Sequence, residues 1–178
     1  MIPRGSNPAA VIKPYPERKR ERFLSADELK SLMDALNTAE AEESINRYEA
    51  AAIRLLIFTG CRLSEITTLE WDSVDLANPR IVLERPDQHG AKIIPLNAPA
   101  LRVLTDLPRV DDNPYVIVGQ KTGKYLINLQ KPWRRVRKAA GLDDVRIHDL
   151  RHNSESRIIP SAAVVSDKIL GLSSGSLA

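Results

Sequence analysis

Apolar residues recur along this chain mostly at the three- and four-residue spacing of an α-helix, which predicts a largely helical domain. The first helix is expected to begin at Ser25, because a serine can cap a helix and Glu28 completes a capping box three positions later. The apolar stripe that follows predicts a helix through about residue 37 and consists of Leu29, Leu32, Met33 and Leu36.

The remaining periodic segments predict further helices and one pair of strands. The further helices are expected at residues 44–59, in a short stretch from about 64, and at residues 98–107, 128–140 and 164–170. Residues 80–84 and 92–96 are typical of two short strands around a polar turn that contains Gly90. The chain is therefore expected to have an α+β fold that is mostly helical, with a small antiparallel sheet at one edge.

The length and composition are those of one globular domain. The chain has 178 residues, of which 43% are hydrophobic and 28% charged, a balance that favours a packed core over disorder. No apolar run is long enough to span a bilayer, and the N-terminus does not resemble a signal peptide. The single cysteine, Cys61, excludes a disulfide within the chain and favours a reducing compartment.

Residues 1–22 are expected to lie outside this domain, which we place at residues 23–178. Residues 3–6, Pro-Arg-Gly-Ser, look like a protease-site remnant from recombinant expression. Three prolines and the run Glu-Arg-Lys-Arg-Glu-Arg at 17–22 then indicate an extended basic linker, which suggests that another segment once preceded it. The alternative is a solvated run of charges.

Candidate chemistry centres on residues 146–152, which read Arg-Ile-His-Asp-Leu-Arg-His. If this stretch is helical, His148 and Arg151 share a face because they lie three positions apart. An imidazole that can move a proton, next to a fixed guanidinium, suits chemistry at a phosphate.

A second candidate lies at the junction of two predicted helices, in Thr-Gly-Cys-Arg-Leu-Ser-Glu-Ile at 59–66. Gly60 is expected to end one helix and the next restarts near Ser64, so that Arg62 can be aimed into a cleft. Glu65, three residues on, can orient Arg62 by a charge-assisted hydrogen bond. The alternative is a surface Arg–Glu pair of little consequence.

Cations gather in the second half of the chain. The pI of about 9.1 and the formal net charge of +3 lean basic, which permits an anionic partner without proving one. The candidate contacts to a DNA phosphate backbone lie in a loop and on the predicted helix 128–140: Lys121, Lys124, Lys131, Arg134, Arg135, Arg137 and Lys138. A solvated helix face explains the helix cations equally well, and the loop lacks the phosphate-loop spacing.

Taken in order, residues 59–66, the strand that ends Ile94-Pro95-Leu96, and residues 147–152 resemble the catalytic domain of the tyrosine recombinases, the phage-integrase family. The resemblance covers about residues 13–152, and the ordered set of motifs is more specific than any one of them. It implies double-stranded DNA as partner, self-association on DNA, and an N-terminal core-binding domain that is missing here. It also implies a bacterial or prophage source and a place in the cytoplasm, at the nucleoid.

The resemblance implies a mechanism that needs no cofactor and no metal. In this family a tyrosine attacks a DNA phosphodiester to form a 3′-phosphotyrosyl link and release a 5′-hydroxyl, and the hydroxyl of a second strand reverses the step. By resemblance, Arg62 and Arg151 hold the non-bridging oxygens in the transition state, and His148 helps to move the proton of the nucleophile. Glu65 matches the acidic residue that supports the first arginine. His152 matches a histidine next to the second arginine, in a structural role.

One departure from the family pattern concerns the proton donor to the leaving oxygen. The family carries a general-acid lysine in the turn between the two strands, and here that position falls near Asp87 or Gln88. The family lysine is therefore expected to be absent. Lys92 or His89 can stand in for it.

Two further departures fall near the C-terminus. A Gly-His pair is expected there, and Leu172 occupies the histidine position, where it cannot hydrogen-bond a phosphate. The nucleophile would follow about nine residues later, beyond Ala178. The nucleophile is therefore expected to be missing through truncation, alteration or decay, and strand cleavage by this chain is not expected.

Rival functions stay open beside DNA recombination. A non-catalytic DNA-binding module of the same fold fits the missing nucleophile, and the fold can also persist without binding DNA on its own. A zinc hydrolase is a further rival, because His148 and His152 have the spacing that places two imidazoles one helical turn apart. Against zinc, Asp149 replaces the usual glutamate base and no clear third ligand follows.

We predict that this chain forms no covalent adduct with DNA. None of its four tyrosines matches the nucleophile position, since all of them precede residue 148: they are Tyr15, Tyr48, Tyr115 and Tyr125. The chain would be incubated with a nicked duplex that traps a covalent intermediate, digested and examined by mass spectrometry. A peptide that carries a phosphotyrosyl-linked nucleotide would contradict the prediction.

Overall fold

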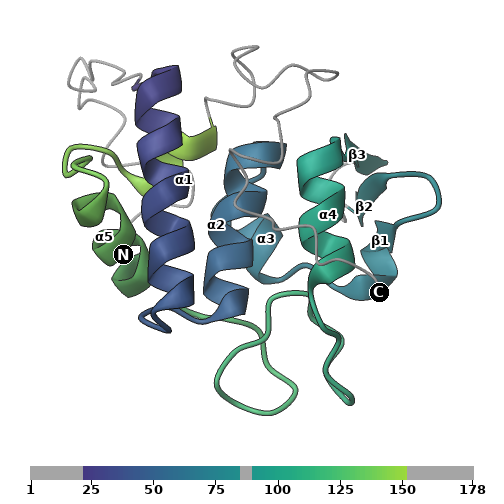
Figure 1. Ribbon diagram of the computed structural model, residues 1–178. Helices are drawn as coiled ribbons and strands as arrows, with labels where there is room; N and C mark the ends of the chain where they lie inside the picture. Colours follow the sequence, from purple (N-terminus) through teal and green to yellow (C-terminus); the bar gives the residue numbers. More distant parts are fainter. Residues whose placement is uncertain (1–21, 85–89, 152–178) are drawn as a thin grey trace, which may run out of the picture.

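The computed structural model describes residues 22–84 and 90–151, and helices form most of this part of the chain (Figure 1). The helices are α1 (Ala26–Ala41), α2 (Arg47–Thr59), α3 (Leu63–Thr67), α4 (Ala98–Asp106) and α5 (Gln130–Ala139), with 3-10 turns η1 (Trp71–Ser73) and η2 (Ile147–Asp149). One antiparallel sheet has the strand order β1 (Val74–Asp75), β2 (Arg80–Glu84), β3 (Ala91–Pro95). The expected α+β class, mostly helical with a small antiparallel sheet, is confirmed.

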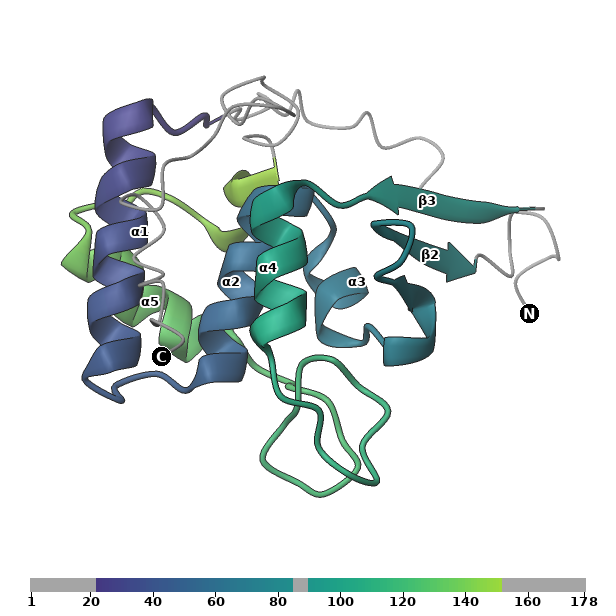
Figure 2. The ribbon, with the colours of Figure 1, turned by 45° about the vertical axis from the view of Figure 1, so that its right-hand side comes forward.

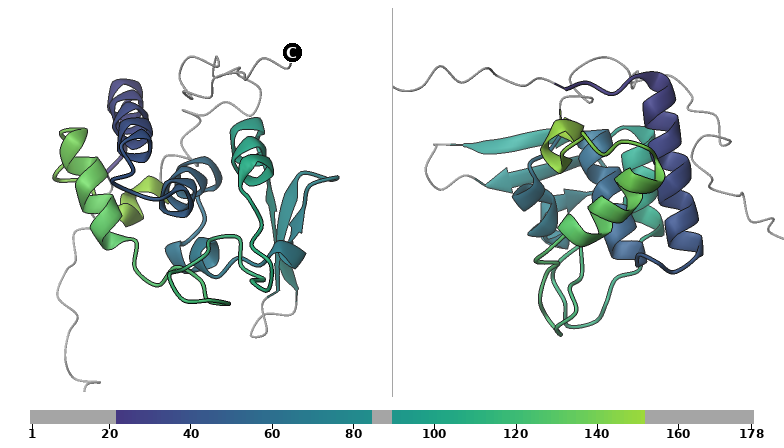
Figure 3. Two further views of the ribbon diagram at one scale, coloured as in Figure 1. Left: turned by 60° about the horizontal axis from the view of Figure 1, so that its bottom comes forward. Right: turned by 90° about the vertical axis from the view of Figure 1, so that its left-hand side faces the viewer.

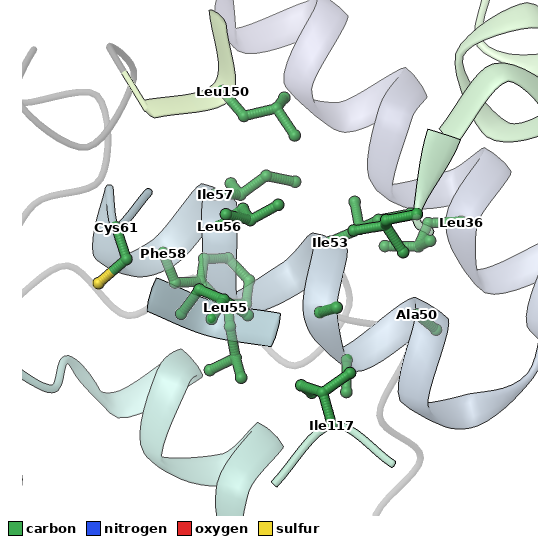
Figure 4. Close-up of a cluster of buried hydrophobic side chains, with 14 of the residues drawn as sticks. Leu36, Ala50, Ile53, Leu55, Leu56, Ile57, Phe58, Cys61, Ile117 and Leu150 are labelled. Carbon is green, nitrogen blue, oxygen red and sulfur yellow. The ribbon is translucent and has the colours of Figure 1, made fainter. Parts of the chain in front are cut away.

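The helices and the sheet are arranged as a row with α2 in the middle. Seen from below in the left panel of Figure 3, the row runs from α5 through α1, α2 and α4 to the sheet at the edge. Every residue of α2 between 50 and 58 is buried except Arg54, and Figure 4 shows these apolar side chains at the centre of the core. A helix that is apolar on all sides has to be covered on all sides, which explains why α2 is central.

Capping residues decide where the first two helices begin. Ser25 and Glu28 form both hydrogen bonds of the predicted capping box. α2 begins later than the predicted residue 44, because Asn46 and Glu49 form a second capping box with two 2.9 Å hydrogen bonds. The hydroxyl of Ser44 instead donates back to the carbonyl oxygen of Ala39. α1 also extends past its predicted end at residue 37, to Ala41.

The predicted strand pair is confirmed to within one residue at each end. β2 and β3 pair in antiparallel register with Ile81 opposite Ile94, and both of these side chains are buried. The two-residue strand β1 has no signal in the sequence pattern, because it is too short for an alternation. The predicted helix at 164–170, and the residues His89, His152 and Leu172, lie outside the described residues.

None of the helices in the described part of the chain combines the length and the apolar character needed to cross a membrane.

Arg22 ties the start of the domain to the segment that precedes η2. Its guanidinium binds both carboxylate oxygens of Glu28 and donates from Nε to Oδ2 of Asp144 at 3.0 Å. The hydrogen bonds from Arg22 and from the Ser25 main chain hold the pKa of Glu28 at about 2, below its ordinary 4.5. The position of the chain entering α1 is thereby linked to the approach to His148.

This ion pair makes stability depend on pH in the acid range. The folded-state pKa of Glu28 is lowered, so the contribution is present above pH 4.5 and is lost as the pH falls toward 2. Glu28→Gln keeps the cap but removes the charge, and should lower the free energy of unfolding at pH 7 by about 1 kcal/mol. Urea unfolding at several pH values would measure this difference.

The matched control is Glu49→Gln, at the equivalent capping position of α2, where the described residues show no ion pair. Glu49→Gln should change the free energy of unfolding little at any pH. An equal cost for the two variants, or a cost for Glu28→Gln that persists near pH 2, would refute the assigned role of Arg22.

Candidate active site

The junction between α2 and α3 presents the first candidate arginine. α2 ends at Gly60, whose left-handed backbone (φ 64°) favours glycine, and the Gly60 N–H donates to the carbonyl oxygen of Leu56. Arg62 follows with an extended backbone directly before α3, and its side chain is exposed. The predicted place of Arg62 at a helix junction is therefore confirmed.

The carboxylate of Glu65 links this junction to the sheet. Its Oε2 accepts the main-chain N–H of Arg62 at 2.7 Å. The ammonium of Lys92, from β3, donates to Oε1 at 2.9 Å and to Oε2 at 2.8 Å. Partial burial alone would raise the pKa of Glu65, but the bonds from Lys92 and Arg62 outweigh it and hold that pKa below its usual range.

The strand alternation of β3 explains how Lys92 reaches Glu65. Side chains two positions apart in a strand point to the same face, so Lys92 faces inward with buried Ile94, whereas Ile93 points outward and is 60% exposed. A charge on an inward face requires a partner. The alternation of β3 therefore indicates from the sequence that Lys92 needs a partner, but it does not identify which carboxylate that partner is.

The second candidate segment forms a helical turn, as the sequence predicted. η2 is capped by the buried carboxylate of Asp149, which accepts the main-chain N–H of Arg146 at 2.8 Å. His148 is exposed and Arg151, three residues on, is half-buried. Figures 1 and 2 both show η2 next to the end of α2 from which α3 continues.

Leu150 fixes this turn on the core. Its side chain is fully buried, and Figure 4 shows it directed toward Ile57 and Leu56 of α2. Because Leu150 lies between His148 and Arg151 in the chain, its burial holds both polar side chains at the surface next to α2.

The thiol of Cys61 shows that charges from three segments meet at this end of α2. Burial raises the pKa of Cys61. A hydrogen bond with Thr59 and the positive charges of Lys92 and Arg151 lower this pKa, whereas the charge of Glu65 raises it. The segments that carry Arg62 and Arg151, far apart in sequence, lie at the same end of the helix, because Arg62 follows α2 and η2 packs next to that end through Leu150.

The predicted DNA-contacting lysines lie elsewhere. Lys121, Lys124 and Lys131 line a cavity of about 280 Å³ together with Glu49, in the first turn of α2. Arg62 follows the opposite end of this 13-residue helix, which corresponds to a separation of about 20 Å at 1.5 Å per residue. These three lysines therefore cannot contact the same phosphate group as Arg62.

Lys131 and the remaining predicted DNA contacts lie on α5. Arg137 is half-buried and donates from Nη1 to the carbonyl oxygen of Val145 at 2.8 Å, so it helps to hold the segment before η2. The exposed cations of this helix are Lys131, Arg134, Arg135 and Lys138.

A zinc site would need ligands from more than one segment. Within residues 22–84 and 90–151, no three or more His, Cys, Asp or Glu side chains are grouped closely enough to hold a metal ion. His152, the second imidazole of that rival, lies outside this range.

Comparison with known proteins identifies the family. The sequence matches the model of the Phage integrase family over residues 22–170. The chain belongs to the phage integrase family. This phage-integrase chain is 29% identical over 174 residues to the integrase of Salmonella phage P22, covering 89% of this chain and 42% of the relative. It is 31% identical over 161 residues to a tyrosine recombinase of Thermosipho africanus, covering 86% and 53%.

The chain thus spans about half the length of the curated relatives it matches. Among solved structures, the phage-integrase chain superposes on XerA recombinase with a TM-score of 0.62 and 24% identity, covering 86% of this chain and 57% of that one. A lambda integrase dimer bound to a core site matches with a TM-score of 0.58 and 21% identity, covering 96% and 50%. These similarities confirm the tyrosine-recombinase catalytic-domain fold that the sequence motifs predicted.

The surroundings of Cys61 predict a slowly reacting thiol. The residue is 2% exposed, and burial raises the pKa of its thiol, so little thiolate forms and reagents cannot reach it. At pH 8 the folded chain should react with a disulfide reagent roughly 100-fold or more slowly than the chain unfolded in guanidinium. Similar rates in the two states would show that this end of α2 opens readily.

Proposed function

We propose that this chain is the catalytic part of a site-specific DNA recombinase that binds duplex DNA and holds one scissile phosphodiester between Arg62 and Arg151. The observation that carries the proposal is the packing of η2, through buried Leu150, next to the end of α2 that Arg62 follows. Membership of the phage integrase family supports the same reading, as do the relatives named as integrase and tyrosine recombinase.

The chemistry follows from the residues at this end of α2. Attack on a phosphodiester adds negative charge to the non-bridging oxygens, and two guanidinium groups stabilise that charge as it develops. His148 lies on the same turn as Arg151 with an exposed imidazole, which suits it to take the proton of the attacking hydroxyl. The proposal concerns the binding and activation of the phosphate.

We assign the flanking DNA contacts to the exposed face of α5. At 100° per residue its four exposed cations fall within one 100° sector, opposite the buried side chains of Trp133 and Val136. From Lys131 to Lys138 this stripe is about 10 Å long, which corresponds to the rise of about three base pairs along a B-DNA axis. The right panel of Figure 3 shows α5 and η2 on the same side of the molecule, so one duplex can meet both.

The proposed function also has consequences for the partners of this chain and for its place in the cell. We propose that recombination needs self-association on DNA and a core-binding domain N-terminal to this one, because a single domain covers only one side of a duplex. The lambda integrase neighbour is a dimer bound to a core site. Action on chromosomal or prophage DNA corresponds to the bacterial nucleoid.

The proposal predicts salt-dependent DNA binding that requires both arginines. Binding to a mixed-sequence duplex would be measured by fluorescence anisotropy between about 50 and 200 mM salt. Arg62→Ala and Arg151→Ala should each weaken binding about tenfold and reduce the log–log salt slope by about 0.9, since each neutralised phosphate contributes that amount.

The matched control is Arg80→Ala, in the sheet, where the guanidinium pairs with Asp75. It should leave affinity and slope unchanged. Parent binding that is insensitive to salt, or arginine variants that behave like the control, would rule the proposal out.

A further inference from the structure

We infer that Lys92 is a positioning residue, which acts on Arg62 through the carboxylate of Glu65 and is not the proton donor of the reaction. The inference deepens the proposed function and rests on it, because it assigns Arg62 to a phosphate. It changes the role expected for Lys92, that of a stand-in general acid.

The hydrogen bonds place Glu65 between Lys92 and the arginine. Both carboxylate oxygens accept from the ammonium, at 2.9 and 2.8 Å, and Oε2 also accepts the Arg62 main-chain N–H at 2.7 Å. The side chain of Glu65 is 14% exposed and that of Lys92 is 26% exposed. The carboxylate is therefore the more buried partner, and the ammonium covers it from the sheet side.

This geometry opposes a role for Lys92 as proton donor. An ammonium has three N–H donors, and the two contacts to Glu65 hold it against α3. A general acid has to lie within hydrogen-bond reach of the leaving oxygen. To reach a leaving oxygen, Lys92 would have to give up its contacts with both carboxylate oxygens of Glu65.

The same geometry explains why Arg62 needs Lys92. Without the ammonium, Glu65 would be a largely buried negative charge that already binds the Arg62 main chain, and would draw the guanidinium of Arg62 away from the phosphate. With Lys92 in place, the charge of Glu65 is balanced, and its carboxylate fixes the Arg62 main chain. The guanidinium then stays available for DNA.

A double-mutant cycle on DNA affinity separates this role from direct phosphate contact. Lys92→Met keeps most of the aliphatic stem and removes the charge. It should weaken duplex binding about tenfold when Glu65 is present, but less than about twofold in the Glu65→Gln background. Lys92→Arg, which can bind both carboxylate oxygens, should stay within about twofold of the parent. If Lys92→Met weakens binding equally in both backgrounds and also lowers the salt slope by about 0.9, Lys92 contacts DNA and the inference fails.

The pH dependence of binding gives an independent readout. In Lys92→Met the partial burial of Glu65 is no longer opposed by an ammonium, so the pKa of this carboxyl rises. Its affinity for the duplex should therefore recover, relative to the parent, as the pH is lowered from about 7 to about 4, through the ordinary range of a glutamate carboxyl, because a protonated Glu65 no longer attracts Arg62. A constant ratio of the two affinities across this range would overturn the inference.

A measurement without DNA keeps the inference distinct from the proposed function. The amide signal of Arg62 in ¹⁵N–¹H spectra reports the hydrogen bond to Glu65. It should shift in Lys92→Met and Glu65→Gln, and stay near its parent position in Lys92→Arg and in Arg80→Met, the matched control at the Asp75 pair. An unmoved signal in a folded Lys92→Met chain would overturn the inference alone. Failure of the parent chain to bind DNA would overturn the proposed function and leave the spectral result standing.

Discussion

The burial of α2 is the constraint on which the rest of this structure depends. From Ala50 to Phe58 the helix is apolar on every side, and its one charged residue in that stretch, Arg54, is paired with Glu40 and Asn37. Burial of each leucine- or isoleucine-sized side chain contributes about 1.5–3 kcal/mol, so covering this helix contributes strongly to the stability of the fold. α1, α3 and α4 pack around it, and the loop residue Ile117 lies in the same cluster (Figure 4).

The candidate active site is a consequence of that packing. Gly60 ends α2 and turns the chain, so Arg62 is placed at the end of the helix by the backbone itself. Arg151 is placed there by a hydrophobic contact, because Leu150 is buried against α2. The position of one arginine therefore depends on a helix terminus and that of the other on the core.

Electrostatics then refine a site that hydrophobic packing has positioned. Glu65 would be costly as an isolated carboxylate at its level of burial, and two donors from different elements satisfy it. The cations of α5 differ in kind. They are exposed, they follow a helix face, and their charge is available to a polyanion. Lys92, which is paired within the site, thus differs from the exposed cations of α5 that the proposed function assigns to DNA.

The sequence by itself determined the helices, the strand pair and the motifs that contain Arg62, His148 and Arg151, because periodicity and capping are local properties of the chain. It placed the start of α2 too early and the end of α1 too soon, since the side-chain hydrogen bonds of Ser44 and Asn46 decide between alternative caps. It also left β1 undetected.

Only the tertiary structure decided which distant groups meet. The pairing of Lys92 with Glu65, the effect of Arg151 on Cys61 and the position of Lys121 and Lys124 at the far end of α2 could not be predicted from the sequence. The physical reason is that the pattern of apolar residues determines which face of an element is buried, whereas the element that covers this face is selected by the packing of the whole domain.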